Sequence, residues 1–111
     1  MAIHGRAPRK GYTLAWTRPA LRDLLEIVEY IRSDNATAAS RFAKDVHAKV
    51  SRLARFPLSG RFLPEFPMTG LREVVIGTYR VIYRVVPSAR RVQILTVRHG
   101  ARRFDIESQT P

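Results

Sequence analysis

The spacing of hydrophobic residues predicts two amphipathic helices in the first half of the chain. In the first helix, which begins after Thr17, apolar residues recur at intervals of three and four and form one stripe: Leu21, Leu24, Leu25, Val28 and Ile31. The second helix is predicted from about residue 36 to residue 55, with the stripe Ala39, Phe42, Ala43, Val46, Val50 and Leu53. Because only a short turn separates the helices, we expect them to form an antiparallel hairpin.

Four other segments have the composition of β-strands. Residues 12–17, YTLAWT, predict a short first strand with Tyr12, Leu14 and Trp16 on one face. Residues 56–70 contain three prolines and two glycines and are predicted to be loop. After that loop, strands are predicted at residues 71–76, 79–86 and 91–98, joined by short turns into an antiparallel meander. The predicted fold is α+β in the order β-α-α-β-β-β, with the N-terminal strand and helical hairpin packed on one face of a small antiparallel sheet.

The strand at residues 79–86 combines hydrophobic side chains with two arginines. Since side chains alternate along a strand, one face carries Tyr79, Val81, Tyr83 and Val85, which we expect to pack on the helices. Arg80 and Arg84 then lie on the opposite face, which no other predicted element covers. This pattern predicts an open sheet surface that bears guanidinium groups.

The charge of the chain points to an anionic partner. The formal net charge is +11, and 17 of the 20 basic residues are arginine, whose planar guanidinium suits carboxylate and phosphate groups. The excess lies in the C-terminal half, where twelve basic residues between His47 and Arg103 face only Glu65 and Glu73. An arginine bias also arises from genomic base composition, so charge alone does not identify the partner.

Several classes of protein do not fit the sequence. The absence of cysteine excludes disulfides and thiolate metal sites, and the three histidines have no metal-ligand spacing, so neither a metal nor a cofactor is expected. No apolar run predicts a secretory signal or a membrane span, so we expect a cytoplasmic protein. A flexible basic segment is predicted at residues 1–11, a single domain at residues 12–104 and a tail at residues 105–111.

Arginine is the candidate functional residue type. The sequence contains no phosphate-binding glycine loop, no paired catalytic carboxylates and no recognisable serine–histidine–aspartate triad. A basic set in the predicted sheet and just after it is expected to bind an anionic partner: Arg72, Arg80, Arg84, Arg98, Arg102 and Arg103. Arg84 and Arg98 can equally be ordinary exposed strand residues. His99, directly after the last strand, is the one histidine considered for a functional role.

Four stretches of the chain resemble one known family. ALRDLLEIVEYI, VSRLARFPLSGR, GLREVVIGTYRVIYRV and VQILTVRHGAR follow one another in the order and spacing found in the ParE/RelE superfamily of type II toxin–antitoxin toxins. The resemblance spans residues 12–103. It implies two N-terminal helices packed on a small sheet, in agreement with the predicted elements. It also implies a cognate antitoxin, ParD-like or of another family, with an acidic C-terminal segment that is disordered until it binds.

Two activities occur in this superfamily. RelE-like toxins cleave mRNA in the ribosome, whereas ParE-like toxins inhibit DNA gyrase without known nuclease chemistry. Arg80 resembles the strand arginine of the nucleases, and Arg102 or Arg103 resembles their arginine after the last strand. However, residues 71–76 contain no lysine, and the tail contains neither tyrosine nor histidine. The resemblance therefore favours a ParE-like gyrase inhibitor with no catalytic residues. The alternative is an mRNA endonuclease in which Arg80 and Arg102 stabilise phosphate and His99 acts as acid or base. A plain nucleic-acid-binding module fits less well, because no predicted helix has a free basic face.

Overall fold

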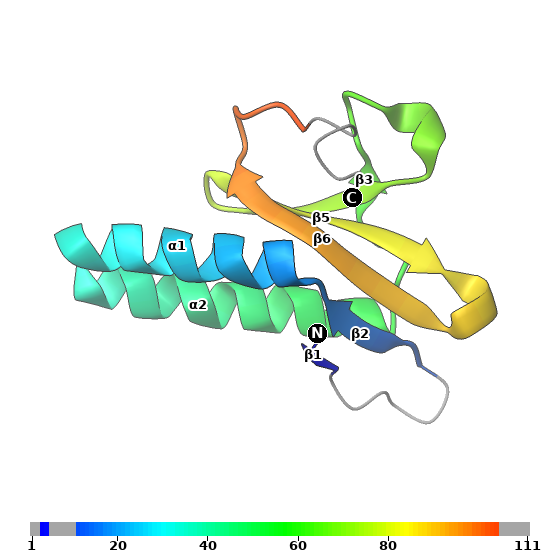
Figure 1. Cartoon of the computed structure of the whole chain (residues 1–111), viewed down its shortest axis with the longest axis horizontal. Coiled ribbons are helices and arrows are strands. Elements are labelled where there is room, and N and C mark those ends of the chain that lie inside the picture. The colour runs from blue at the N-terminus through cyan, green and yellow to red at the C-terminus, as the bar shows by residue number, and fades with distance from the viewer. Residues whose placement is uncertain (1–2, 5–10, 105–111) are drawn as a thin grey trace.

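The computed structural model describes residues 3–4, of which only the backbone is considered, and residues 11–104. Within these residues, one six-stranded sheet carries two helices across one face (Figure 1). The helices are α1 (Arg18–Asp34) and α2 (Ala36–Ser51), and the strands are β1 (Ile3–His4), β2 (Thr13–Trp16), β3 (Arg61–Phe62), β4 (Arg72–Ile76), β5 (Tyr79–Val86) and β6 (Arg91–His99). Short 3-10 turns cover Arg52–Ala54, Pro67–Thr69 and Pro87–Ala89.

The sheet has the strand order β1-β2-β6-β5-β4-β3. Strands β4, β5 and β6 form the predicted antiparallel meander. The sheet as a whole is mixed, because β2 pairs with β6 in parallel. The loop at residues 56–70 also contributes β3, a two-residue strand that pairs with β4. The α+β fold and its element order are confirmed, while the wholly antiparallel sheet and the strand-free loop are corrected.

Side chains at the helix starts explain where the helices begin. Thr17 accepts a hydrogen bond from the Ala20 N–H at 3.3 Å, and Asn35 accepts one from the Ala38 N–H at 3.0 Å. The stripe of α1 differs from the prediction at Ile27 and Leu25. Ile27 packs against the core, whereas Leu25 is 68% exposed. Leu25 adjoins Leu24 in sequence and so lies about 100° further round the helix, beyond the face that meets the sheet.

Two hydrophobic cores lie on opposite faces of the sheet. The larger core joins the helices to the residues of β5 that were predicted to face them, and it includes Val46, Val50, Val81, Tyr83 and Ile94. The smaller core lies on the other face and consists of Leu63, Leu71, Ile82, Leu95 and Phe104. Figure 1 shows that the loop carrying β3 and the residues just after β6 lie on this side of the sheet, away from the helices. The second sheet face is therefore partly covered, not open as predicted.

Some predictions fall at the ends of the chain. The flexible segment at residues 1–11 and the tail at residues 105–111 lie outside the described residues, apart from Gly11 and the backbone of Ile3–His4, which pairs with β2. The bounds 12–104 for a single domain stay a prediction. No helix in the described part of the chain is long and apolar enough to span a membrane.

Candidate functional site

A close contact between Gly60 and Tyr83 fixes the irregular loop against the sheet. The Tyr83 hydroxyl accepts a hydrogen bond from the Gly60 N–H at 2.9 Å and donates one to the Pro57 carbonyl at 2.8 Å. A Cβ atom at residue 60 would lie 2.5 Å from the Tyr83 hydroxyl oxygen. Glycine is therefore required here. β3 begins directly after this contact, and the residues that follow β3 cross the face of the sheet away from the helices.

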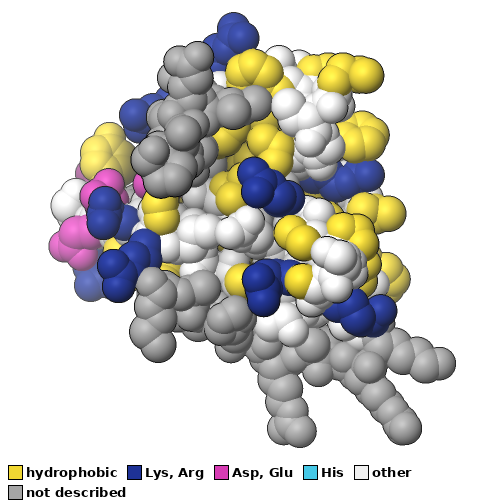
Figure 2. Space-filling view, turned by 45° about the vertical axis from the view of Figure 1, so that its right-hand side comes forward, with side chains coloured by type: hydrophobic (Ala, Val, Ile, Leu, Met, Phe, Trp, Pro, Cys, Tyr) yellow, Lys and Arg dark blue, Asp and Glu magenta, His cyan; other side chains and the backbone are white. Residues whose placement is uncertain are grey.

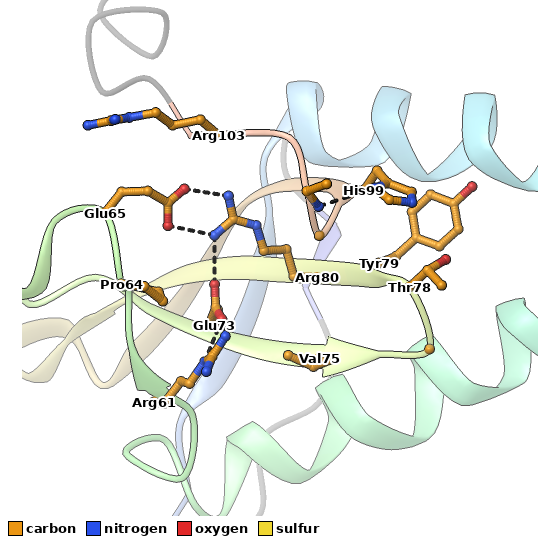
Figure 3. Close-up of a pocket in the computed structure, with 13 residues that line it drawn as sticks. Arg61, Pro64, Glu65, Glu73, Val75, Thr78, Tyr79, Arg80, His99 and Arg103 are labelled. Atoms are coloured by element: carbon orange, nitrogen blue, oxygen red, sulfur yellow. Dashed lines mark hydrogen bonds and ion pairs between the residues drawn. The ribbon is translucent and has the colours of Figure 1, made fainter.

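Arg80 lies at the centre of the candidate site and is only 5% exposed. Its Nη1 donates to the Glu65 and Glu73 carboxylates at 2.8 Å each, and its Nη2 donates to Glu65 and, at 2.7 Å, to the Arg102 carbonyl. Glu73 is itself buried and also accepts from Arg61 Nε at 2.6 Å. Figure 3 shows the guanidinium of Arg80 between the two carboxylates. Two carboxylates thus neutralise this arginine within the chain.

These contacts stabilise the ionised forms of both Glu65 and Arg80. The hydrogen bonds from Arg80 lower the pKa of Glu65 from about 4.5 to about 2, and the Phe104 N–H, which donates to Glu65 at 2.8 Å, contributes in the same direction. The Glu65 carboxylate raises the pKa of Arg80 further, with Glu73 adding to the effect. Both groups are therefore ionised at neutral pH, and neither is a proton donor or acceptor there.

The prediction that Arg80 faces an open surface is wrong. Alternation along β5 does place Arg80 on the face away from the helices, opposite Val75 of β4 and Arg98 of β6. The loop before β4, however, brings Glu65 over that face. Neither Glu65 nor Glu73 was predicted as a site residue. Glu65 and Glu73 are the two acidic residues between His47 and Arg103, a stretch with twelve basic residues. This pattern indicates that each carboxylate pairs with a basic side chain.

Arg84, Arg102 and Arg103 have exposed side chains, as a partner-binding role requires. Arg72 does not share their surface. It alternates onto the side of β4 that carries Val74 and Ile76, and its Nη1 donates to the Gly60 carbonyl at 2.8 Å. The structure therefore separates Arg72 from the other predicted residues, because it lies on the opposite face of the sheet.

Arg98 is partly buried beside Phe104. Its Nη1 donates to the Arg103 carbonyl at 2.9 Å, and its guanidinium lies 5.1 Å from the centre of the Phe104 ring. Burial lowers the pKa of Arg98 from its ordinary value. These contacts tie the chain after β6 to the sheet, so Arg98 has a structural role whether or not it also contacts a partner.

His99 is exposed at the end of β6. Its Nδ1 accepts a hydrogen bond from the Ala101 N–H at 3.1 Å, and its ring lies edge-on to Tyr79 at 5.6 Å. Figure 3 shows His99 and Tyr79 together, on the other side of Arg80 from the two carboxylates. Since Nδ1 already accepts a hydrogen bond, only Nε2 of the imidazole is left to exchange a proton with a ligand.

A hollow of about 610 Å³ lies between Arg80 and His99, and we call it the Arg80 hollow. Its wall includes the charged residues Arg61, Glu65, Glu73, Arg80 and Arg103, together with Tyr79, His99 and the backbone at Gly77 and Gly100. No three potential metal-ligating side chains gather among the residues that the structure describes. The arginines of the wall can form ion pairs and donate hydrogen bonds.

Charge on the molecular surface is distributed unevenly. On the face in Figure 2, Lys and Arg side chains are spread over the surface between hydrophobic and uncharged groups, whereas Asp and Glu gather at its left edge. An acidic partner would find complementary charge on this face.

Comparison with known proteins places the chain in a family. Residues 14–104 match the ParE toxin family of type II toxin–antitoxin systems, parDE. The chain is 38% identical to Y4kP of Sinorhizobium fredii over 89 residues, which cover 78% of this chain and 86% of that protein. It is 36% identical to toxin RelE2 of Caulobacter vibrioides over 90 residues, which cover 80% of this chain and 96% of the relative.

Solved structures agree with this placement. The chain matches the chromosomal ParDE system of P. aeruginosa with a TM-score of 0.65 and 23% identity, covering 78% of this chain and 92% of the other. It matches the RelBE2 toxin–antitoxin complex of Mycobacterium tuberculosis with a TM-score of 0.53 and 32% identity, covering 80% and 98%. The fold, the match over residues 14–104 and the relatives agree: this chain belongs to the ParE toxin family, within the ParE/RelE superfamily of type II toxin–antitoxin toxins.

Proposed function

We propose that this toxin acts without catalysis, by inhibiting DNA gyrase, and that a cognate antitoxin neutralises it. The observation that carries the proposal is the state of Arg80. A guanidinium that stabilises a cleaved phosphate must present free N–H groups to it. In this chain both terminal nitrogens of Arg80 already donate to Glu65, Glu73 and the Arg102 carbonyl.

The surroundings of Arg80 support the same proposal. General acid–base catalysis needs a titratable group within hydrogen-bond reach of the reacting atoms. Around the Arg80 hollow, the two carboxylates are held by arginine, and His99 and Tyr79 are the remaining titratable side chains in the described wall. The exposed arginines, by contrast, are well placed for binding a protein surface. Since gyrase acts on the chromosome, the proposed site of action is the cytoplasm.

The second candidate is the ribosome-dependent mRNA endonuclease. The 36% identity to toxin RelE2 of C. vibrioides and the RelBE2 match favour it. In this mechanism Arg102, which is exposed, would contact phosphate and Nε2 of His99 would exchange a proton. Arg80 could take part only after Glu65 moved away from it.

One pair of assays separates the candidates. The purified chain is added to a gyrase supercoiling reaction and, separately, to translating ribosomes whose mRNA is read by primer extension. The proposal expects loss of supercoiling with intact transcripts, and recovery of supercoiling when the antitoxin is added. Cleaved transcripts with unaffected supercoiling would overturn it. If cleavage occurs, Arg102→Ala and His99→Ala test whether this chain performs it, because both side chains are exposed and neither change removes a buried contact.

A further inference from the structure

A second hollow lies along the open edge of β4. Strand β3 pairs only with the first two residues of β4, so the edge beyond Glu73 has no strand beside it among the described residues. This edge, the end of α2 and the start of β3 enclose a hollow of about 340 Å³, and we call it the Arg52 hollow. Its wall carries three basic side chains, Lys49, Arg52 and Arg61.

Each of these basic side chains keeps hydrogen-bond donors for a ligand. Lys49 Nζ uses one of its three N–H groups on the Val75 carbonyl, at 3.1 Å. Arg61 directs Nε and Nη2 to the Glu73 carboxylate, which leaves its Nη1. The exposed Arg52 side chain makes no hydrogen bond or ion pair within the described part of the chain. The wall therefore holds more donors than the chain itself uses.

The backbone of β4 adds one more donor. The N–H and C=O groups of one strand residue point to the same side of the strand. Because Lys49 reaches the Val75 carbonyl, the Val75 N–H also faces this edge. The pairing of β3 ends at Glu73, so no neighbouring strand in the described residues accepts that N–H. Donors from α2, β3 and β4 thus surround one space.

The wall of the Arg52 hollow is positively charged. Lys49, Arg52 and Arg61 are opposed by Glu73 alone, which leaves two positive charges (three minus one). Glu73 is buried, and Figure 3 shows its carboxylate between Arg61 and Arg80, so it does not repel a ligand as a free carboxylate would. In the wall of the Arg80 hollow, two carboxylates oppose three arginines. The Arg52 hollow is therefore the better site for an anion.

The arrangement of donors fits phosphate better than carboxylate. A carboxylate has two oxygens in one plane and is matched by a single guanidinium fork. Here the fork of Arg61 is already occupied by Glu73, and the other donors belong to separate groups. The tetrahedral oxygens of a phosphate can accept from several directions at once. A nucleic-acid strand also brings successive phosphates, which suits a wall with more than one positive charge.

We infer that the Arg52 hollow binds a backbone phosphate of the DNA on which gyrase acts, with Lys49, Arg52 and the Val75 N–H as donors. The choice of DNA rests on the proposed function, because an inhibitor of gyrase meets that enzyme with its DNA. The phosphate site itself depends only on the chain. This contact would let the toxin bind the enzyme and its DNA together.

A titration of the isolated full chain tests the phosphate site. The chain is labelled with ¹⁵N, and its backbone amide signals are followed by NMR while dimethyl phosphate or acetate is added at constant ionic strength. Both anions carry one negative charge, so they differ in shape. We expect the Val75 and Ser59 signals to shift and saturate with dimethyl phosphate, and acetate to bind several-fold more weakly. The Gly100 amide, in the wall of the Arg80 hollow, should not move.

Two neighbouring arginines provide a matched pair of variants. Arg52 lines the hollow, whereas Arg55 is equally exposed and does not. Arg52→Ala should weaken binding of dimethyl phosphate about 2–5-fold, as loss of an exposed charge does, and Arg55→Ala should leave it unchanged. Fluorescence anisotropy then measures binding to a short labelled DNA duplex at several salt concentrations. Arg52→Ala should reduce the slope of log affinity against log salt by about 1, and Arg55→Ala should not.

Each contrary outcome overturns the inference. Saturation by acetate at the same concentration as by dimethyl phosphate would make the hollow a carboxylate site. Absence of saturation, or equal losses in Arg52→Ala and Arg55→Ala, would show a general effect of charge. Tighter binding to single-stranded RNA than to the DNA duplex, with the same dependence on Arg52, would assign the phosphate to RNA. None of these measurements contains gyrase, so a failed supercoiling assay and a failed titration are distinguishable.

Discussion

Glu65 and Arg80 are fifteen residues apart in sequence, and both terminal nitrogens of Arg80 donate to the two oxygens of Glu65. The same carboxylate accepts the Phe104 N–H at 2.8 Å. One side chain therefore joins three segments: the loop before β4, strand β5 and the chain that follows β6. This junction closes the smaller core. It also occupies N–H groups on both terminal nitrogens of Arg80, the arginine that most resembles a nuclease residue.

Glu65→Gln is expected to destabilise the fold by about 1–3 kcal/mol, because the amide cannot accept both guanidinium N–H groups and leaves a buried donor unsatisfied. The free energy of unfolding in urea at pH 7 measures the loss. Glu29→Gln is the control, since Glu29 is exposed and its contact with Arg32 is 3.7 Å long. That change should cost less than about 0.5 kcal/mol. Equal stability of the two variants would show that the Glu65 contacts contribute little.

The same carboxylate makes stability depend on pH. The pKa of Glu65 in the folded chain is about 2, below its ordinary value of about 4.5. Its stabilising contribution is therefore fully present above pH 4.5 and is lost as the pH falls toward 2. We expect the difference in unfolding free energy between the wild type and Glu65→Gln to shrink across this range. A difference that stays constant from pH 7 to pH 2 would contradict the lowered pKa.

The elements that sequence predicts well are those with a regular period. The stripes on α1 and α2 and the alternation along β5 are properties of short stretches, so the helix-facing residues Val81 and Tyr83 could be identified without knowing what they contact. Leu25 shows where a periodic pattern fails to predict burial. Its spacing fits the stripe, but the width of the buried face depends on how the helix lies on the sheet.

The candidate site could be predicted only in part, because it depends on an irregular loop. Composition predicts that residues 56–70 do not form a helix, but no period tells where a loop without regular structure travels. The contact between Gly60 and Tyr83 sends it across the sheet, and this places Glu65 on Arg80. The sequence alone therefore predicted the correct face for Arg80 and the wrong exposure.

Gly60→Ala should destabilise the protein by about 1–3 kcal/mol, as overpacking in a fixed environment does. The added Cβ would lie 2.5 Å from the Tyr83 hydroxyl and 2.6 Å from the Glu73 carbonyl. Gly70→Ala is the matched control: Gly70 has a φ of 79°, but a Cβ added there would have no atom within 4 Å, so this variant reports backbone strain without a clash. Thermal unfolding should give the lower midpoint for Gly60→Ala. The reverse order would mean that the loop can move away from Tyr83.

Asp23→Ala should weaken the contact between α1 and the part of β6 that lies beyond its pairing with β2. Asp23 Oδ2 accepts from the Thr96 hydroxyl at 2.6 Å and from the Val97 N–H at 3.2 Å, beyond the residues that β2 pairs. Losing this acceptor should cost about 1–3 kcal/mol and speed hydrogen exchange at the Val97 amide. Asp34→Ala, at the exposed end of α1, should change neither quantity. Unchanged exchange at Val97 in Asp23→Ala would show that water replaces the carboxylate without loss.

Arg84→Glu tests whether the exposed sheet arginines attract the antitoxin. Arg84 is exposed on β5, so reversing its charge should change long-range attraction while leaving the fold intact. We expect the association rate with the antitoxin to fall about 2–10-fold at low salt, and the difference to shrink at high salt as the charges are screened. Arg18→Glu, in the charge-balanced first helix, is the control. Stopped-flow mixing at several salt concentrations measures both. An effect on dissociation alone, or one that does not depend on salt, would show that Arg84 makes a close contact and does not steer the partner.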